Sequence, residues 1–269
     1  MKVGFITFAG GDVFWRISSR RIMLQAKNSK EFIKFKSYKP KDLNHIANEK
    51  DLAFISENKK GFGYWLWKPI IVLDFLLNNP EIESILYTDS GCDLNFNIDS
   101  KIIWHQYLNH LESYDCVVFK MELIEKYWTK EELFLAFPKY GEFKESEQIL
   151  GGVFLMKRDF AIQFCENWLK SMRTLDYQLL VDEYNHEIQI PNFRQHRHDQ
   201  SFFSLLVKNY TSALILDSLH EVYFEPDWQT GKKYPIWTSR NKSYIPKYRS
   251  DLLSRSLRLL ERFLKKLIL

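Results

Sequence analysis

Short apolar runs alternate with longer helical segments along most of the chain, and this alternation constrains the fold more than any other feature. The expected strands cover residues 3–8, 32–38, 85–87, 115–120 and 148–156. The expected helices cover residues 15–26, 70–77, 102–111 and 160–175. Strands that alternate with helices are typical of βαβ units, which place their strands side by side in one sheet. The sequence therefore predicts an α/β fold with a mixed, mostly parallel sheet flanked by helices.

Size and charge limit the kinds of protein that the chain can be. It has 269 residues, of which 45% are hydrophobic, and this is enough for one large domain. We expect that domain to span residues 1–248 and a separate segment to cover residues 249–269. The net charge is +4 and the pI about 8.7. This mild positive charge suits an anionic ligand or a membrane surface, but it is too weak to indicate a nucleic-acid partner.

The cysteines and the apolar runs indicate a compartment. Cys92, Cys116 and Cys165 lie far apart and show no CxxC spacing. This pattern argues against a disulfide framework and a zinc site, and it fits a reducing environment. The apolar run at 3–8 is interrupted too soon to be a signal peptide, and no apolar run is long enough to span a bilayer. We therefore expect a cytoplasmic protein with peripheral contact at the inner membrane.

Residues 251–269 are predicted to form a basic amphipathic helix. Leucines and Phe263 recur there at helical spacing, whereas arginines and lysines collect on the opposite side. Helices of this type lie in a membrane interface, where anionic lipids attract Lys and Arg. We expect this helix to hold the protein at the inner membrane surface. The alternative is a helix that packs on the domain or on a second subunit.

The turn that follows the apolar run at 85–87 is the first candidate site. Ligands bind at the carboxyl ends of strands in an open α/β sheet, so Asp89 stands where a ligand or metal would bind. Gly91 permits a sharp bend or a close approach of a ligand. Asp93 supplies a second carboxylate, and such oxygen donors suit Mg²⁺ or Mn²⁺, so we assign Asp89 and Asp93 as metal ligands. The alternative is a turn in which Asp89 caps its own backbone.

A stretch rich in glycine and aromatic residues is the second candidate. Residues 61–69 read Gly-Phe-Gly-Tyr-Trp-Leu-Trp-Lys-Pro. The glycines permit a strained backbone, and Pro69 suits the first turn of a helix. A helix N-terminus beside Lys68 is a plausible anion site, but the aromatic side chains would equally plug the edge of the sheet. Arg21 or Arg20 is a further phosphate candidate, with an exposed position on the helix as the alternative.

Two later segments complete the set of candidates. Gly151 and Gly152 interrupt a predicted strand, which marks a bulge or the close approach of another group. Residues 196–201 read His-Arg-His-Asp-Gln-Ser and precede an apolar helical run. A polar turn on a buried helix fits catalysis or ligand positioning. Asp199 also fits a plain N-cap, where a carboxylate complements the helix dipole.

Four motifs taken together resemble a family of bacterial sugar transferases from capsule and lipopolysaccharide gene clusters, which are similar to GT-A glycosyltransferases. The motifs are residues 61–69, 86–92 (Leu-Tyr-Thr-Asp-Ser-Gly-Cys), 145–149 (Glu-Ser-Glu-Gln-Ile) and 196–201. The similarity extends over about residues 1–245. It implies a GT-A, Rossmann-like sheet, a nucleotide-diphosphate-sugar donor and usually Mn²⁺ or Mg²⁺. It also implies a cell-surface polysaccharide or lipid-linked glycan as the acceptor.

The resemblance assigns metal-binding roles with one departure. In GT-A enzymes an Asp-x-Asp motif at a strand end holds the metal on the diphosphate. The matching residues here are Asp89, Ser90 and Gly91, so the second Asp is replaced by glycine. Asp93 or a water molecule would take its place. His220 is a candidate for the late metal ligand that some of these families use, with a plain surface position as the alternative.

The resemblance also suggests catalytic residues. Asp199 and Gln200 are similar to an acidic-amide pair that faces the sugar in several GT-A families. An inverting enzyme needs a carboxylate base near the acceptor hydroxyl, and for this role Asp199 is the first candidate and Glu145 the second. In a retaining enzyme Asp199 or Gln200 would instead support the sugar, and the sequence leaves both possibilities open.

The predicted donor-binding residues come from all of these segments. They are Thr7, Phe8, Arg21, Gly63, Trp67, Lys68, Asp89, Ser90, Gly91, Gly151, Gly152 and His198. Lys68 or Arg21 would help to neutralise the diphosphate as its bond to the sugar breaks. Aromatic side chains would stack on the base or the sugar.

Two other functions stay open at this point. The incomplete Asp-x-Asp motif would fit a non-catalytic sugar-nucleotide-binding or scaffold protein. Asp89, Asp93 and Asp199 would also suit a metal-dependent phosphodiesterase or nuclease. The mild charge makes this the weaker hypothesis, because such an enzyme is expected to have a strongly basic groove.

Overall fold

The computed structural model describes residues 1–216, 231, 233–245, 256–257 and 259–260. Within this part of the chain a six-stranded sheet has the strand order β2-β1-β3-β6-β5-β7. Its strands are β1 (Val3–Phe8), β2 (Lys34–Tyr38), β3 (Ser84–Thr88), β5 (Cys116–Ile124), β6 (Glu147–Lys157) and β7 (Ala213–Leu216). Neighbouring strands are parallel, except that β6 runs antiparallel to β3 and β5. The predicted α/β fold with a mixed, mostly parallel sheet is confirmed.

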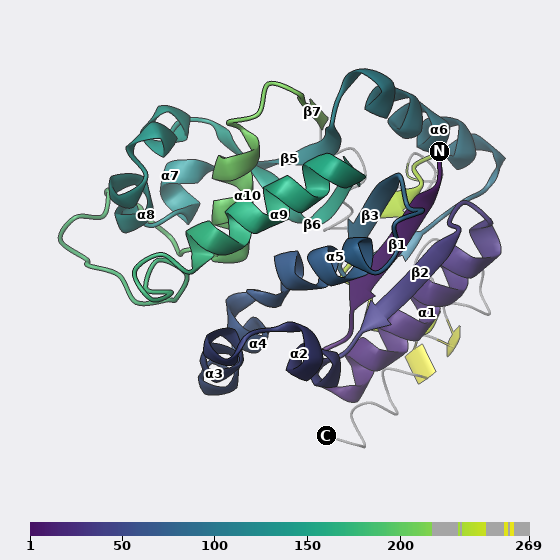
Figure 1. The fold of residues 1–269 in the computed structure, drawn as a ribbon, viewed down its shortest axis with the longest axis horizontal. Helices are drawn as coiled ribbons and strands as arrows, with labels where there is room; N and C mark the ends of the chain where they lie inside the picture. The colour runs from purple at the N-terminus through teal and green to yellow at the C-terminus, as the bar shows by residue number, and fades with distance from the viewer. Residues whose placement is uncertain (217–230, 232, 246–255, 258, 261–269) are drawn as a thin grey trace.

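Helices cover both faces of this sheet. Long helices α5 (Trp67–Leu77) and α9 (Arg158–Met172) lie in front of the strands in Figure 1, and α1 (Val13–Ser29) and α6 (Ile98–Ser113) pack on the other face. The strand residues alternate accordingly. In β1, Phe5 belongs to the core under α1 and α6, whereas Ile6 belongs to the core under α5 and α9. This is the two-residue period that a strand buried on both faces requires.

Shorter elements complete the structure. They are α2 (Pro40–Ile46), α3 (Glu49–Glu57), α4 (Gly61–Tyr64), α7 (Glu125–Trp128), α8 (Glu131–Ala136), the 3₁₀ turn η1 (Pro138–Phe143) and α10 (Asp199–Val207). A small second sheet joins β4 (Asp93–Leu94) to β8 (Ile236–Trp237) in antiparallel register. The second sheet brings residues near position 237 back to the turn that follows β3.

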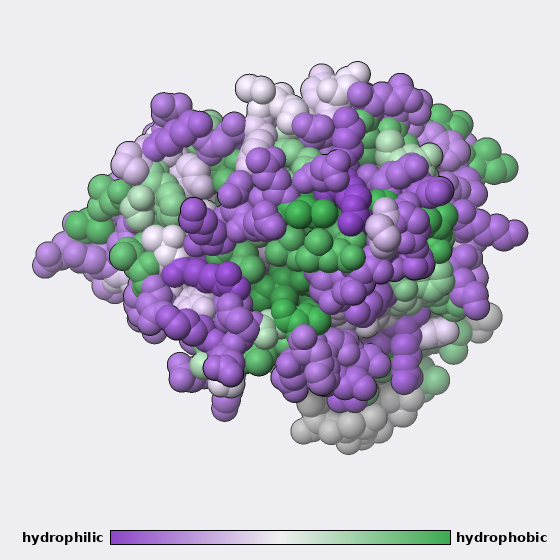
Figure 2. All heavy atoms as spheres, in the orientation of Figure 1, coloured by the Kyte–Doolittle hydropathy of each residue, from purple (hydrophilic) through white to green (hydrophobic). Residues whose placement is uncertain are grey.

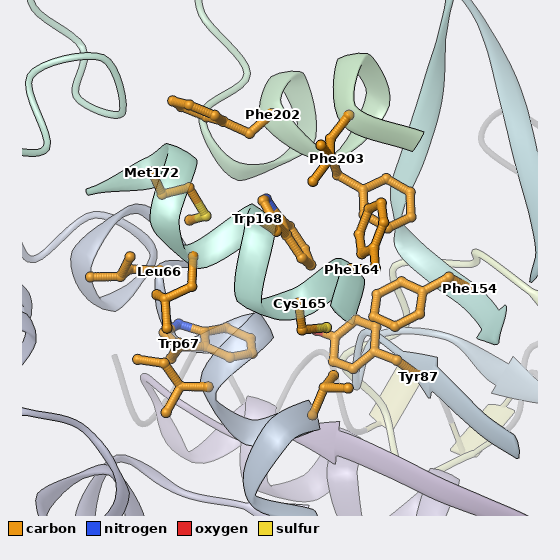
Figure 3. Close-up of a cluster of buried hydrophobic side chains, with 14 of the residues drawn as sticks. Leu66, Trp67, Tyr87, Phe154, Phe164, Cys165, Trp168, Met172, Phe202 and Phe203 are labelled. Atoms are coloured by element: carbon orange, nitrogen blue, oxygen red, sulfur yellow. The ribbon is translucent and has the colours of Figure 1, made fainter. Parts of the chain in front are cut away.

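Aromatic residues of the candidate-site segments share one hydrophobic core. Figure 3 shows Trp67, Tyr87, Phe154 and Phe203 in this cluster, around the side chains of α9. The Phe154 ring stacks on Tyr87 at 4.9 Å and on Phe203 at 5.2 Å between ring centroids. These rings come from α10 and from strands β3 and β6. The packing therefore fixes those elements relative to one another.

The backbone of residues 61–65 is left-handed throughout. The φ angles of these five residues lie between +50° and +75°. Left-handed backbone costs roughly 1–2 kcal/mol for each residue other than glycine, so surrounding contacts have to hold it. One such contact is the Trp67 indole N–H, which donates to the Gly61 carbonyl at 2.8 Å. Helix α5 starts at Trp67, earlier than predicted, and places Lys68 inside its first turn.

One predicted helix start is wrong. The spacing of Thr129 and Glu132 predicts a capping box, but α8 is preceded by Lys130. The Thr129 hydroxyl instead donates to Glu125 Oε2 at 2.8 Å. The Thr129 hydroxyl thus bonds to the buried Glu125 carboxylate and does not cap α8.

Apolar side chains gather in the middle of the face shown in Figure 2. Leu77, the last residue of α5, is 64% exposed. Among the described residues, no helix combines the length and the apolar character needed to cross a bilayer. The amphipathic helix predicted for 251–269 lies outside the described residues, apart from positions 256–257 and 259–260.

Candidate active site

Two carboxylates from distant segments meet around the amine of Lys68. Lys68 Nζ lies 2.7 Å from Asp199 Oδ2 and 3.6 Å from Asp89 Oδ1, and it donates to the Gly151 carbonyl at 3.0 Å. These residues come from α5, the end of β3, the start of α10 and the middle of β6. The side chains of Lys68 and Asp199 are buried, whereas that of Asp89 is 46% exposed. Asp89 is therefore the member of this cluster that is most exposed to solvent.

Burial and mutual charge shift the pKa values of the cluster. Burial by itself would lower the pKa of Lys68, but the carboxylates of Asp199 and Asp89 outweigh it, and the pKa is raised. Burial raises the pKa of Asp199 to about 6, against the opposing effect of Lys68 and with a further increase from Asp89. Lys68 is thus a firmly held cation, and Asp199 gains or loses a proton near neutral pH.

Asp89 is held through both its side chain and its backbone. The Tyr87 hydroxyl donates to Oδ1 at 2.7 Å, and the backbone N–H of Asp89 donates to the Gly152 carbonyl at 2.8 Å. Burial and the nearby Asp89 charge raise the pKa of Tyr87 well above its usual value, so its hydroxyl stays a donor. The side chain thus contacts Tyr87 and Lys68, as a positioned functional group would.

The glycine pair of β6 makes room for these contacts. The register between β5 and β6 shifts in this region, so the strand carries the predicted bulge. A Cβ added at Gly152 would lie 2.7 Å from Asp89 Oδ2, and one added at Gly151 would lie 3.2 Å from the Cα of Gln200. The predicted close approach is confirmed at both glycines.

The polar turn before α10 does not form a side-chain cap. His198 precedes the helix with φ +49° and makes no capping hydrogen bond through its side chain, and Asp199 is the first helical residue. Instead of serving as the N-cap, Asp199 faces Lys68. Gln200 turns its amide N–H to the Gln148 carbonyl oxygen at 2.8 Å. The interpretation of this turn as a positioning segment is therefore favoured over the N-cap.

His198 joins this turn to the left-handed segment. Its ring lies 4.7 Å from the ring of Tyr64 and 5.8 Å from that of Trp65, and Nδ1 bonds the Leu180 carbonyl at 2.8 Å. Because that carbonyl only accepts, Nδ1 carries the hydrogen. Burial lowers the pKa of His198 to about 4, against the opposing effect of Asp182, whose Oδ1 lies 3.3 Å from Nε2.

The aromatic stretch acts as packing at the end of β1. The Phe8 ring stacks on Trp67 at 3.8 Å with 19° between the ring planes. Thr7 is fully buried beside it. Gly63 lies so close to Ile55 that an added Cβ would approach its Cγ1 to 2.7 Å. The aromatic plug is thus present, and Lys68 turns inward to carboxylates, although the sequence placed it at an anion site.

Arg21 and Asp93, predicted to bind phosphate and metal, bind each other. Arg21 Nε lies 2.8 Å from Asp93 Oδ1, and both side chains are buried. The exposed position considered for Arg21 is therefore wrong. Its guanidinium also donates to the carbonyls of Ser90 and Cys92 at 3.3 and 2.8 Å. Asp93 further accepts from the Ser239 hydroxyl at 2.7 Å. The pair fastens the turn after β3 to the later part of the chain.

Gly91 and Glu145 also have clear structural settings. The Gly91 carbonyl accepts from the Asn241 backbone N–H at 2.7 Å, and an added Cβ would lie 3.3 Å from the Cα of Arg240. Glu145 is 76% exposed and pairs with Lys126 at 2.6 Å. The structure does not bring Glu145 to the cluster around Lys68, because its turn lies on the surface. His220 lies outside the described residues.

The fit of a divalent cation can be tested on the donor atoms. In the described part of the chain, no group of three or more His, Cys, Asp or Glu side chains is arranged to hold a metal. Asp93 is occupied by Arg21, so the predicted pair of metal ligands does not form. Asp89 keeps an exposed carboxylate. Mg²⁺ usually takes one or two carboxylates and completes its shell with water and substrate phosphates, and this mode suits Asp89.

Sequence reasoning missed three supporting residues. Tyr87 and Gln148 stand inside the motifs, but no pattern signals that one donates to Asp89 and the other bonds to Gln200. Glu125 is fully buried and bonds to Gln148 at 3.0 Å. Its position at the end of an apolar run gives no signal that its carboxylate is buried.

Comparisons with known proteins concern the fold. No protein-family model and no curated protein sequence matches the chain. Among solved structures it is similar to a glycosyltransferase involved in the glycosylation of the major capsid of PBCV-1, with 11% identity and a TM-score of 0.48 over 88% of this chain and 92% of that one. It is also similar to mouse xyloside xylosyltransferase 1 in its apo form, with 12% identity and a TM-score of 0.44 over 88% of this chain and 97% of that one. At these values the function has to be argued from the side chains of the site.

Proposed function

We propose that the protein is a glycosyltransferase that moves a sugar from a nucleotide-diphosphate donor to a cell-surface polysaccharide or lipid-linked glycan, as in capsule or lipopolysaccharide synthesis. One observation carries the proposal. Lys68, Asp89 and Asp199 belong to three separate motifs that resemble sugar transferases, and in the fold both carboxylates lie within 3.6 Å of the Lys68 amine. Residues that lie far apart in the sequence and meet only in the fold are typical of a ligand site.

The residues of the cluster take different parts in sugar transfer. The acceptor oxygen forms a bond to the anomeric carbon while the bond from that carbon to the diphosphate breaks, and the diphosphate leaves with the electron pair. Asp89, the exposed carboxylate, would hold Mn²⁺ or Mg²⁺, which supplies positive charge to the leaving diphosphate. Lys68 lies between the two carboxylates and offsets their charge, so both stay in place next to each other.

Asp199 is the candidate for proton transfer. If the reaction inverts the anomeric centre, the acceptor hydroxyl gives its proton to a carboxylate, and a raised pKa of about 6 suits a general base near neutral pH. If the reaction retains the configuration, Asp199 and Gln200 face the sugar instead. NMR of the anomeric proton in the product distinguishes the two.

A thermal-shift screen tests the proposal. The protein is melted with UDP-, GDP-, dTDP- and CMP-sugars, each with Mn²⁺ and with EDTA, because ligand binding to the folded state raises the melting temperature. We expect one diphosphate class to stabilise the protein. Asp89→Asn should lose that shift, and Glu145→Gln should keep it because Glu145 lies on the surface.

The outcomes separate the competing functions. If no sugar nucleotide shifts the melting temperature in either condition, the proposal is wrong. A shift without sugar transfer to any acceptor, unchanged in Asp89→Asn, would support the non-catalytic binding protein instead.

A further inference from the structure

A buried chain of hydrogen bonds runs from Glu125 to the site. Glu125 Oε2 accepts from Gln148 Nε2 at 3.0 Å, and Gln148 Oε1 accepts from Gln200 Nε2 at 2.8 Å. Gln200 Oε1 in turn accepts from the backbone N–H of Gly151 at 3.5 Å. The Gly151 carbonyl then accepts from Lys68 at 3.0 Å. The chain thus links a carboxylate outside every motif to the central amine of the site.

The charge of Glu125 decides which way each amide in this chain points. A carboxylate only accepts hydrogen bonds, so Gln148 has to present its NH₂ group to Glu125. The carbonyl of Gln148 therefore faces Gln200, which presents its own NH₂ group and turns its carbonyl to the Gly151 N–H. One buried charge thus fixes two amides that would otherwise have two orientations each.

Glu125 is held in its place by donors on every side. Lys208 Nζ donates to Oε1 at 2.8 Å, and the Ser204 hydroxyl donates to the same oxygen. The Thr129 hydroxyl donates to Oε2 at 2.8 Å. Burial lowers the pKa of Lys208, and the Glu125 charge opposes this effect. Breaking such a buried pair on one side is costly, because an unpaired charge is left behind.

We propose that Glu125 is a positioning residue for the site, acting through Gln148 on Gln200. Its consequence for catalysis rests on the proposed sugar transfer. Gln200 directly follows Asp199, and its Cα lies against Gly151. The relay therefore sets the amide beside the candidate base, and it holds the β6 bulge that carries the acceptor carbonyl for Lys68.

Glu125→Gln should reverse the relay while conserving shape. Lys208 and Ser204 remain donors, so they take the carbonyl of the introduced amide, whose NH₂ group then faces Gln148. Gln148 has to turn its carbonyl toward position 125, and Gln200 has to turn in response. The NH₂ group of Gln200 would then oppose the Gly151 N–H, two donors without an acceptor.

A second substitution should restore the original orientation. With Lys208→Met added to Glu125→Gln, the obligate donor on that side is gone, and the Ser204 hydroxyl can accept from the introduced NH₂ group. The introduced carbonyl can then accept from Gln148 as the carboxylate did. Thr129→Val is the matched control. It removes one donor to the same carboxylate and one acceptor of Gln148 Nε2 at 3.2 Å, but Gln148 still faces that carboxylate and keeps its orientation.

The relay itself is tested by NMR on protein labelled with ¹⁵N in glutamine side chains and glycine. We expect the side-chain signals of Gln148 and Gln200 and the backbone signal of Gly151 to move in Glu125→Gln. All three should return in the double variant. In Thr129→Val the Gln148 signal should move, because Gln148 loses its contact with the Thr129 hydroxyl, whereas the signals of Gln200 and Gly151 should stay in place. Unmoved signals in a folded Glu125→Gln protein would overturn the relay, whether or not the chain transfers sugars.

Kinetics test the role in catalysis. Glu125→Gln should lower the kcat of sugar transfer by about tenfold or more, as small misplacements of reacting groups do, with a smaller change in the KM for the donor. The double variant should regain most of that kcat, although it also loses a buried ion pair. A purely structural role predicts the opposite, with the least stable variant the least active. Moved NMR signals with an unchanged kcat would refute the positioning role and leave the proposed sugar transfer intact.

Discussion

Replacing Gly152 by alanine is a direct test of the geometry at Asp89. The added Cβ would lie 2.7 Å from Asp89 Oδ2, whereas ordinary contact begins at about 3.4 Å. The carboxylate therefore has to retreat by about 0.7 Å. That retreat weakens the 2.7 Å hydrogen bond from Tyr87 and changes the 3.6 Å separation from Lys68.

The magnitude of each effect follows from the exposure of Asp89. Its side chain is 46% exposed, so it can turn toward solvent. The unfolding free energy should fall by no more than about 1 kcal/mol, the low end of overpacking costs. Sugar transfer should suffer more, because a shift of about 1 Å in a reacting geometry costs about 100-fold. We expect kcat/KM to fall by about 10- to 100-fold at a nearly unchanged melting temperature.

Gly141→Ala provides the control for this experiment. No atom lies within 4 Å of a Cβ added at Gly141, so the same chemical change meets open space. Sugar-transfer kinetics and thermal unfolding are measured on both variants. Wild-type kcat/KM in Gly152→Ala would refute the reasoning about Asp89. If Gly152→Ala is unfolded while Gly141→Ala is folded, the Asp89 carboxylate cannot retreat. That result would refute the expected small loss of unfolding free energy.

Three further predictions concern charge. Lys68→Met leaves the buried Asp199 carboxylate without its cation, and it should lower the unfolding free energy measured in urea by about 3–5 kcal/mol. Adding Asp199→Leu should restore most of that loss. Equal stability of the single and the double variant would contradict this prediction. Because the pKa of Asp199 is raised to about 6 from 3.8, its contribution to stability is fully present below pH 4 and is lost as the pH rises through 6. Unfolding measured at pH 4–8 should therefore show a downward slope between about pH 4 and 6, of at most about 1.4 kcal/mol per pH unit, which Asp199→Asn lacks. Deleting residues 251–269 should abolish sedimentation with anionic vesicles and spare transfer to a soluble acceptor, whereas continued sedimentation would contradict the membrane role.

The fold was predictable where local pattern and burial agree. Strand β1 covers residues 3–8 as predicted, because a strand buried on both faces needs an unbroken apolar run. The start of α5 was not predictable in the same way. It depends on the left-handed backbone of residues 61–65, and tertiary contacts such as that between Gly63 and Ile55 hold that backbone.

The sequence predicted which residues belong to the candidate site better than it predicted which of them contact each other. Asp89 was expected at a strand end, where the topology of an α/β sheet gathers ligand-binding residues. The partner of Asp93 was not, since the buried pair with Arg21 depends on which faces of α1 and β4 meet. Glu145 stands in a motif but lies on the surface, and Glu125 stands in none but is fully buried. Sequence spacing carries no information about such depth.

Each charged member of the site lies close in sequence to an aromatic residue of one core. Trp67 precedes Lys68, and Tyr87 lies two residues before Asp89. Phe203 follows Asp199 by one helical turn, and Figure 3 shows the three rings in the same buried cluster. Protein interiors are packed as densely as organic crystals, so the distances among the charged atoms are set largely by how these rings fit together. Asp89 alone among the three charges has a half-exposed side chain. It is therefore the group that can adjust to a ligand while Lys68 and Asp199 keep their places.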